Sequence, residues 1–165
     1  MGANSEIAWT FRVIGTPAPG GSKNAFVPKR KDGSFVTRPG GSLMVNVTDA
    51  GGKANKEWKK AVAIQARAFM RSTPPREGPI EVELVHCIKR PKNHFRTGKF
   101  SGVLADSAPR HHTQKPDALK FARATEDALT GIIWVDDCQN VRLTTVKRWC
   151  YPGEQPGCIV SITYL

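Results

Sequence analysis

The sequence is poor in acidic residues and contains no long hydrophobic run. Its 165 residues include 14 Asp and Glu against 25 Lys and Arg, so the net charge is +11. Because it has neither an apolar segment long enough to span a bilayer nor a strongly amphipathic basic helix, we expect no membrane partner. So large a positive charge on a compact domain favours a polyanionic partner. The alternative is a basic surface that only keeps the protein soluble.

Cysteine is also scarce, and none of the four cysteines belongs to a CxxC pair. The sequence therefore supports neither a zinc ribbon nor a redox motif, and we expect the four cysteines to be packing residues or inert thiols. The first residues, MGANSEIAWTFRV, lack the charged and apolar regions of a secretory signal. We therefore expect a cytoplasmic protein, in which free thiols are normal.

Apolar residues alternate along some segments and recur every three to four residues along others. Alternation is typical of half-buried strands, and the longer period is typical of amphipathic helices. These patterns predict strands at residues 7–14, 80–88, 140–149 and 158–165, and helices at residues 54–71 and 117–131. Because the strands are segregated and the helices are only two, we expect an α+β fold: a single domain, residues 1–165, with a mixed β-sheet packed against two main helices.

Each predicted helix presents one apolar stripe to the sheet. The stripe of the first helix is Trp58, Val62, Ala66 and Phe69. The stripe of the second helix is Leu119, Ala122, Glu126 and Leu129, broadened by Phe121, Ala124 and Ala128.

Two further segments are rich in Lys and Arg. The sequence pattern of residues 25–38 predicts a basic hairpin around an Asp32-Gly33 turn. Residues 89–115 form a long basic loop without periodicity, which contains seven Lys and Arg, one acid, two aromatics and three of the four histidines. A loop of this length is functional or disordered, and its mixture of basic and aromatic residues favours contact with nucleic acid. The histidine spacing matches no metal-ligand motif, so phosphate contact or plain solvation is expected.

Residues 115–137, KPDALKFARATEDALTGIIWVDD, place acids at both ends of a helix and the extension that follows it. Asp127 lies ten residues beyond Asp117, about 15 Å along a helix, so these two cannot share one ion. The apolar run 132–135, if extended, returns toward the helix start and brings Asp136 or Asp137 beside Asp117. Adjacent carboxylates repel unless a cation lies between them. The pattern is therefore compatible with a Mg²⁺ site that activates water against a phosphodiester.

The same acids also have purely structural interpretations. Asp117 is a good helix N-cap, where its charge suits the helix dipole. Asp136 and Asp137 fit a polar turn between strands.

The chain resembles the RusA family of Holliday junction resolvases, found in bacteria and their phages. Residues 115–141 are the most specific part: KPD, a helix ending in DALTG, then an aromatic residue and DD followed by Q and V. The opening FRVIGTPAPGGSK, the helix around Trp58 and the run RPKNHFRTG…HHTQKPD also resemble phage-type members. The resemblance implies a RusA-like homodimer that uses Mg²⁺, or Mn²⁺ in its place, to cut symmetrically across four-way DNA junctions in recombination and repair. It would act in the cytoplasm of a bacterium or a phage-infected cell.

The resemblance also implies roles for single residues. The first Asp of the family motif is Asp117, and the downstream pair is Asp136 and Asp137, of which Asp137 is the family's metal-binding member. Arg123 stands at the motif's basic position, with Lys120 on the same face. The implied catalytic residues are Asp117, Asp137 and Arg123, and the implied metal ligands are Asp117, Asp136 and Asp137.

One motif position departs from the family pattern, because Leu119 replaces the second Asp. Losing one of three carboxylates weakens metal binding, and Asp136, Glu81 or Glu83 are the candidates to supply the missing oxygen. Arg123 in place of the family's Lys keeps the positive charge but changes the donor geometry.

Three functions remain open. The first is a Mg²⁺-dependent endonuclease for four-way junctions, the second is a catalytically impaired protein that binds branched DNA, and the third is a nuclease for other branched or flapped DNA. In each case we expect basic side chains to contact the DNA: Lys29, Arg30, Lys92, Arg96, Lys99, Lys115 and Lys120.

Overall fold

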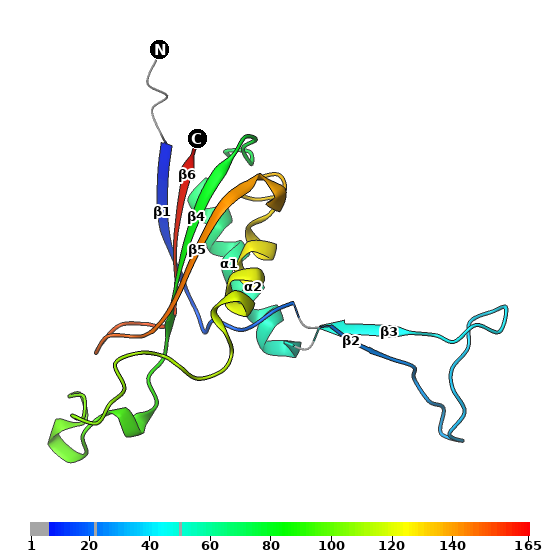
Figure 1. Cartoon of the computed structure of the whole chain (residues 1–165), viewed down its shortest axis with the longest axis horizontal. Coiled ribbons are helices and arrows are strands. Elements are labelled where there is room, and N and C mark those ends of the chain that lie inside the picture. Colours follow the sequence, from blue (N-terminus) through cyan, green and yellow to red (C-terminus); the bar gives the residue numbers. More distant parts are fainter. Residues whose placement is uncertain (1–6, 22, 50) are drawn as a thin grey trace, which may run out of the picture.

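A four-stranded mixed sheet forms the centre of the protein (Figure 1). The computed structural model describes residues 7–21, 23–49 and 51–165. The strands lie in the order β1 (Ile7–Ile14), β6 (Gly157–Tyr164), β4 (Ile80–Ile88) and β5 (Asn140–Trp149). Only β4 and β5 pair in parallel, and the other neighbours are antiparallel. The predicted strands and the predicted α+β class are confirmed.

Two helices, α1 (Gly52–Met70) and α2 (Ala118–Leu129), pack against each other and cover one face of this sheet (Figure 1). Trp58 and Val62 of α1 meet Leu84 and Val160 of the sheet in one fully buried core. Each such aliphatic side chain contributes about 1.5–3 kcal/mol by leaving water. Neither helix in the described part of the chain is long and apolar enough to cross a membrane.

The predicted stripe of α1 is correct through Ala66 but ends at Met70 rather than Phe69. The i+4 spacing carries the buried face to Met70, whereas Phe69 remains 37% exposed. Phe69 instead stacks on Phe11 of β1 with ring centroids 4.7 Å apart, so it closes the edge of the core.

The predicted stripe of α2 is wrong at two of its four positions. Leu119 is 68% exposed and Glu126 is half-buried, while Thr125 is fully buried. The buried face turns toward Thr125 because its hydroxyl accepts a hydrogen bond from Trp58 Nε1 at 3.2 Å and shares another with His86 Nε2 at 3.0 Å. Helix α2 is therefore fixed to the core by a polar contact that an apolar stripe does not reveal, and Leu119 and Glu126 face outward.

Residues 131–133 form a turn and Trp134 makes only isolated β-bridges, so the predicted extended run is wrong. The backbone N–H of Ile132 donates to Leu129 O at 3.0 Å, and that of Gly131 to Trp134 O at 2.7 Å. Burial of Ile133 and Trp134 holds this turn against the core. Strand β5 makes the return along α2 instead, because Lys147 Nζ donates to Pro116 O at 2.7 Å, beside the helix start.

A two-stranded arm projects from the body (Figure 1). It consists of β2 (Lys23–Phe26) and β3 (Asn46–Asp49), paired antiparallel. The predicted Asp32-Gly33 turn is present at its end, where Arg30 N donates to Ser34 O at 2.8 Å. The alternation analysis did not identify β3, because two turns and only short extended pieces separate it from β2.

Residues 89–115 form a lobe with two short 3₁₀ turns, η1 (Lys92–His94) and η2 (Gly98–Phe100). Its base is packed on Trp149: the ring centroid of His94 lies 4.9 Å from the indole, and that of His112 lies 4.2 Å from it. Both histidines are 7% exposed. Plain solvation is therefore wrong for these two residues, which anchor the lobe through ring contacts, while His111 is exposed.

Candidate active site

A groove of about 310 Å³ runs between α2, β5 and the loop that follows β1. Its lining includes Leu119, Arg123 and Glu126 from α2, Leu143 from β5, and Gly20 and Gly21 from the loop. The loop can lie this close because Gly20 has no side chain: a Cβ there would sit 3.2 Å from Ala124 Cα. Its N–H donates to Lys120 O at 2.9 Å.

Gly21 positions the guanidinium in this groove. Its backbone φ of +84° is a conformation that glycine adopts readily. A Cβ at this position would lie 2.3 Å from Arg123 Cδ, so the glycine leaves room for the arginine side chain. Arg123 is therefore held across the middle of the groove by the loop after β1.

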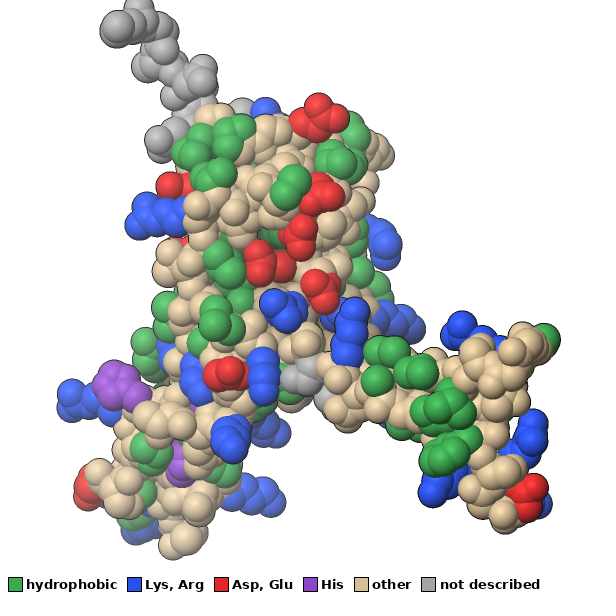
Figure 2. Space-filling model, turned by 45° about the vertical axis from the view of Figure 1, so that its right-hand side comes forward, with side chains coloured by type: hydrophobic (Ala, Val, Ile, Leu, Met, Phe, Trp, Pro, Cys, Tyr) green, Lys and Arg blue, Asp and Glu red, His purple; other side chains and the backbone are tan. Residues whose placement is uncertain are grey.

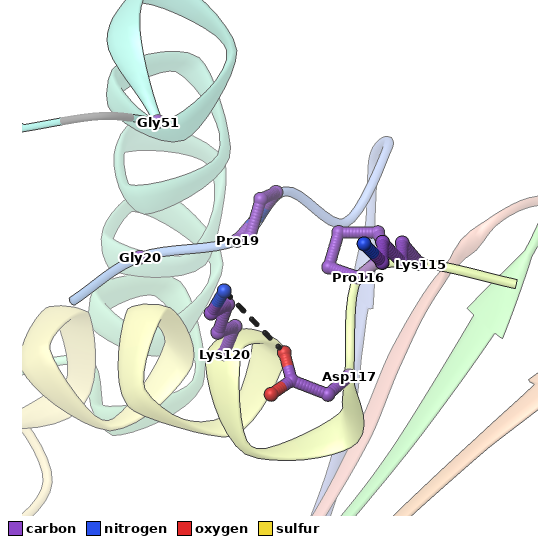
Figure 3. A pocket seen from close by; sticks show the side chains of 7 residues that line it. All are labelled: Pro19, Gly20, Gly51, Lys115, Pro116, Asp117 and Lys120. Carbon is purple, nitrogen blue, oxygen red and sulfur yellow. Dashed lines mark ion pairs between the residues drawn. The ribbon is translucent and has the colours of Figure 1, made fainter. Parts of the chain in front are cut away.

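The helix start forms the basic end of the site (Figure 3). A pocket of about 510 Å³ lies there, lined by Pro19, Gly20, Gly51, Lys115, Pro116, Asp117 and Lys120. Asp117 is the N-cap residue of α2, but its side chain makes no capping hydrogen bond. Its carboxylate faces Lys120, with Oδ1 4.0 Å from Nζ (Figure 3). The capping interpretation of Asp117 therefore has no hydrogen bond to support it.

The other end of α2 is acidic. Asp136 and Asp137 are exposed and begin a short turn, η3 (Asp137–Gln139), where Asp136 Oδ1 accepts from Cys138 N at 2.9 Å. The hydrogen bonds from Cys138 and the contact with the Asp137 side chain lower the pKa of Asp136. The turn interpretation of these acids is thus correct for the backbone, but Asp137 makes no capping bond of its own.

Glu126 completes the acidic end, from the last turn of α2. Its Oε1 accepts a hydrogen bond from Asn140 Nδ2 at 2.7 Å. Burial raises the pKa of Glu126 first of all, the bond from Asn140 opposes that change, and the charges of Asp137 and Asp127 add to it. Glu126 and Asp137 are therefore close enough to repel each other.

The predicted meeting of Asp117 with Asp136 or Asp137 is not found in this structure. Glu126 follows Asp117 by nine residues, about 14 Å along the helix. Asp137 lies close enough to Glu126 for its charge to act on that carboxyl, and Asn140 bonds the same side chain. It is Lys147, later in β5, that reaches the helix start at Pro116. Across the described residues, no group of three or more His, Cys, Asp and Glu is placed to hold one metal ion. The three predicted metal ligands therefore divide into one residue at the basic end and two at the acidic end.

The two alternative oxygen donors lie on the wrong face of the sheet. Val82 and Leu84 of β4 point into the core, so the alternating residues Glu81 and Glu83 point to the face that no helix covers. There they line a separate pocket with Arg142, whose Nη1 lies 3.5 Å from Glu81 Oε2. Neither glutamate can contribute to the groove along α2.

The predicted DNA-binding residues lie on three separate features. Lys29 and Arg30 lie on the arm, Lys92, Arg96 and Lys99 on the lobe, and Lys115 and Lys120 at the basic pocket. Figure 2 shows Asp and Glu side chains gathered on the upper body, with Lys and Arg side chains below them and along the arm and the lobe. The cations thus flank the groove on both sides.

Sequence reasoning missed three contributors to the site: Glu126, Asn140 and Lys147. Glu126 was assigned to the buried stripe because its spacing from Ala122 and Leu129 is helical. The roles of Asn140 and Lys147 depend on how β5 lies along α2, which no local pattern reveals. The Gly20-Gly21 pair was a visible signal, because two adjacent glycines in a loop mark a close backbone approach.

Comparison with known proteins identifies the family of this chain. A family model described as Endodeoxyribonuclease RusA matches residues 37–163. That span contains α1, α2, the lobe and all the residues of the groove except the loop after β1. No curated protein matches the chain. Since the match covers most of its length, the chain belongs to the RusA family of endodeoxyribonucleases.

Proposed function

We propose that this protein is a Mg²⁺-dependent endodeoxyribonuclease that resolves four-way DNA junctions. One observation carries the proposal: a single groove in a RusA-family domain combines cations, Lys120 and Arg123, with carboxylates, Glu126 and the neighbouring Asp137. Cutting a phosphodiester requires both, because cations hold the phosphate and carboxylates hold the metal ion.

The acidic end suits a divalent ion by its donor chemistry. Asp136 and Asp137 present exposed carboxylates in contact with each other, and such a pair is most stable with a cation between its members. Mg²⁺ binds through one or two protein carboxylates and keeps several waters, so one or both of these residues would contribute to holding it. The bound ion would activate water and neutralise charge on the phosphate.

The basic residues would hold the scissile strand. Arg123 is exposed in the middle of the groove, between the carboxylates and the helix start. Its planar guanidinium can donate two hydrogen bonds to a phosphate. Lys120 would contact the next phosphate along, and Asp117 would orient its ammonium group. The arm and the lobe would follow the DNA backbone away from the cut, with affinity that falls as salt rises.

A second copy of the chain is part of this proposal. A four-way junction is cut on two strands related by symmetry, whereas each chain contains one groove. A twofold homodimer would present two grooves and two arms to the same junction.

The test is cleavage of a synthetic four-way junction by purified protein with Mg²⁺, compared with linear duplex and flapped DNA. We expect paired nicks at symmetric positions of the junction and none in the duplex. The Asp137→Asn variant is the matched control, because it removes one carboxylate without changing the side-chain shape. The proposal is overturned if the protein cleaves the junction with neither Mg²⁺ nor Mn²⁺ while another RusA-family nuclease cleaves it under the same conditions.

Leu119 favours a second candidate, a branched-DNA-binding protein without catalysis. Its exposed side chain lies in the groove where the family motif has a carboxylate. In that case the wild-type protein binds junctions without cutting them, and Leu119→Asp creates cleavage. If wild-type protein cuts and Asp137→Asn does not, this candidate is excluded.

A further inference from the structure

We propose that Glu126 supplies the metal-binding carboxylate that position 119 lacks. The ligand set at the acidic end would then be Glu126 and Asp137, with the amide oxygen of Asn140. This inference rests on the proposed metal-dependent function and names the residues that make it workable in this chain.

Positions 119, 123 and 126 lie on one stripe of α2, because they are spaced by four and three residues. All three side chains line the same groove. Positions 119 and 126 lie about 10 Å apart along the helix, so their side chains enter the groove on opposite sides of Arg123. In this chain the first is a leucine, and the second is a glutamate.

The contacts of Glu126 leave it available to a cation. Its Oε1 accepts from Asn140, and within the described residues Oε2 has no hydrogen bond and the carboxylate forms no ion pair. Burial and the negative charge of Asp137 disfavour the ionised form of Glu126, while the hydrogen bond from Asn140 and the charge of Arg123 oppose them. A bound cation would oppose them further.

Asn140 provides a second observation at the same place. Its Nδ2 is used by Glu126, which fixes the amide so that Oδ1 points away from that bond. Oδ1 is buried and has no hydrogen-bond partner among the described residues. Buried amide oxygens are nearly always paired, and an amide oxygen is a ligand that Mg²⁺ accepts. Glu126 and Asn140 thus form one unit, with one free oxygen on each side chain.

Asp127 serves as the matched control. It is the next residue of the same helix, but its Oδ2 lies 2.7 Å from Lys59 Nζ, so it points to α1 and is already paired. Neutralising Asp127 changes the net charge by the same amount as neutralising Glu126 and leaves the groove unchanged.

The experiment is Mn²⁺ binding without DNA, followed by electron paramagnetic resonance and calorimetry. For Glu126→Gln we expect a loss of Mn²⁺ affinity of about tenfold or more, since even supporting partners of metal ligands contribute that much. Asn140→Ala should lose less, and Asp127→Asn should bind within about twofold of wild type. Circular dichroism checks that each variant is folded.

The outcomes separate this inference from the proposed function. Equal Mn²⁺ affinity for Glu126→Gln and Asp127→Asn would overturn the role of Glu126, as would wild-type protein that binds no Mn²⁺. If Glu126→Gln loses Mn²⁺ but the wild type cuts no junction, the metal site stands and the proposed substrate is wrong. If the wild type cuts and only Asp137→Asn loses Mn²⁺, the proposed function stands without Glu126.

Discussion

The two ends of helix α2 differ in charge in the opposite sense to the helix dipole. The first turn contains Lys120 and no acid, and the last turn contains Glu126 and Asp127 and no base. A helix is stabilised by acids at its start and by cations at its end, each worth about 0.3–1 kcal/mol. Apart from Asp117, the charges of α2 are therefore placed where they do not stabilise the helix. Such a reversal is expected where charge serves ligand binding.

If the proposed function is correct, the reversal also separates two tasks along one groove. The basic end would hold phosphate without competing for the metal, and the acidic end would hold metal without repelling phosphate at the same point. Arg123 lies between the two, where both would meet the scissile group. Four predictions test whether the ends act separately.

The largest effect is expected from the aspartates at the two ends. Asp137→Asn should reduce junction cleavage by at least about a thousandfold, because the metal contributes several kcal/mol to the transition state. Asp117→Asn should reduce cleavage by about tenfold through the position of Lys120. Mn²⁺ affinity should fall only for Asp137→Asn. Equal loss of Mn²⁺ affinity in both variants would show that the ends form one site.

The next effect concerns the anchor shared by both ends. Burial lowers the pKa of His86 to about 4, against about 6.5 in the unfolded chain. Between these values the unfolded chain binds more protons, so the free energy of unfolding should fall by about 3 kcal/mol as the pH decreases from 6.5 to 4. Urea titrations at a series of pH values measure it.

His86→Gln is the control for that pH dependence, and its curve should be flatter. The pH dependence of stability that remains in this variant includes the contribution of His112, whose pKa is also lowered by burial and by the charge of Lys147. An unchanged slope in His86→Gln would show that the contact between His86 and Thr125 does not govern the acid stability of α2.

A smaller effect is expected for single cations at the basic end. Lys120→Ala should weaken junction binding by about 1 kcal/mol and reduce the salt slope by about one. Mn²⁺ affinity should not change. Fluorescence anisotropy in the Asp137→Asn background measures binding without cleavage. Arg67→Ala is the control, because Arg67 is exposed in the last turn of α1, about 24 Å along the helix from Gly51 at the basic pocket. If junction affinity does not change with salt concentration, the assignment of Lys120 as a phosphate-binding residue is contradicted.

The smallest effect tests the dipole argument directly. Glu126→Gln should raise the free energy of unfolding by about 0.5 kcal/mol and the melting temperature by about 1–2 °C without metal. Addition of Mn²⁺ should stabilise the wild type more than the variant. A lower melting temperature of the metal-free variant would mean that Glu126 has a structural role through Asn140.

Local patterns were sufficient for the two helices and the four strands of the main sheet, but not for β3 or for the contacts between elements. Trp58, Val62 and Ala66 repeat with the helical period, so the buried face of α1 was predictable. Leu119 was predicted to be buried because leucine at that spacing suits a core, yet the helix is rotated by the hydrogen bonds of Thr125. A buried threonine is not a signal that hydrophobic periodicity can detect.

The candidate site divides in the same way. The motif around Asp117, Arg123 and Asp137 was recognisable from the residues, as was the departure at Leu119. Their distances were not, because the run 132–135 has apolar residues that fit a strand or a buried turn equally well. The turn forms because it buries Ile133 and Trp134 in the core.

The sequence by itself determined the positive charge, the two helices and the strands of the main sheet, and the family of this protein, because each depends on composition or on short-range order. The tertiary structure decided which carboxylates share a groove. Parallel pairing of β5 with β4 carries Asn140 to Glu126 and Lys147 to the start of α2. Strand order is set by packing between distant residues, so no local pattern contains it.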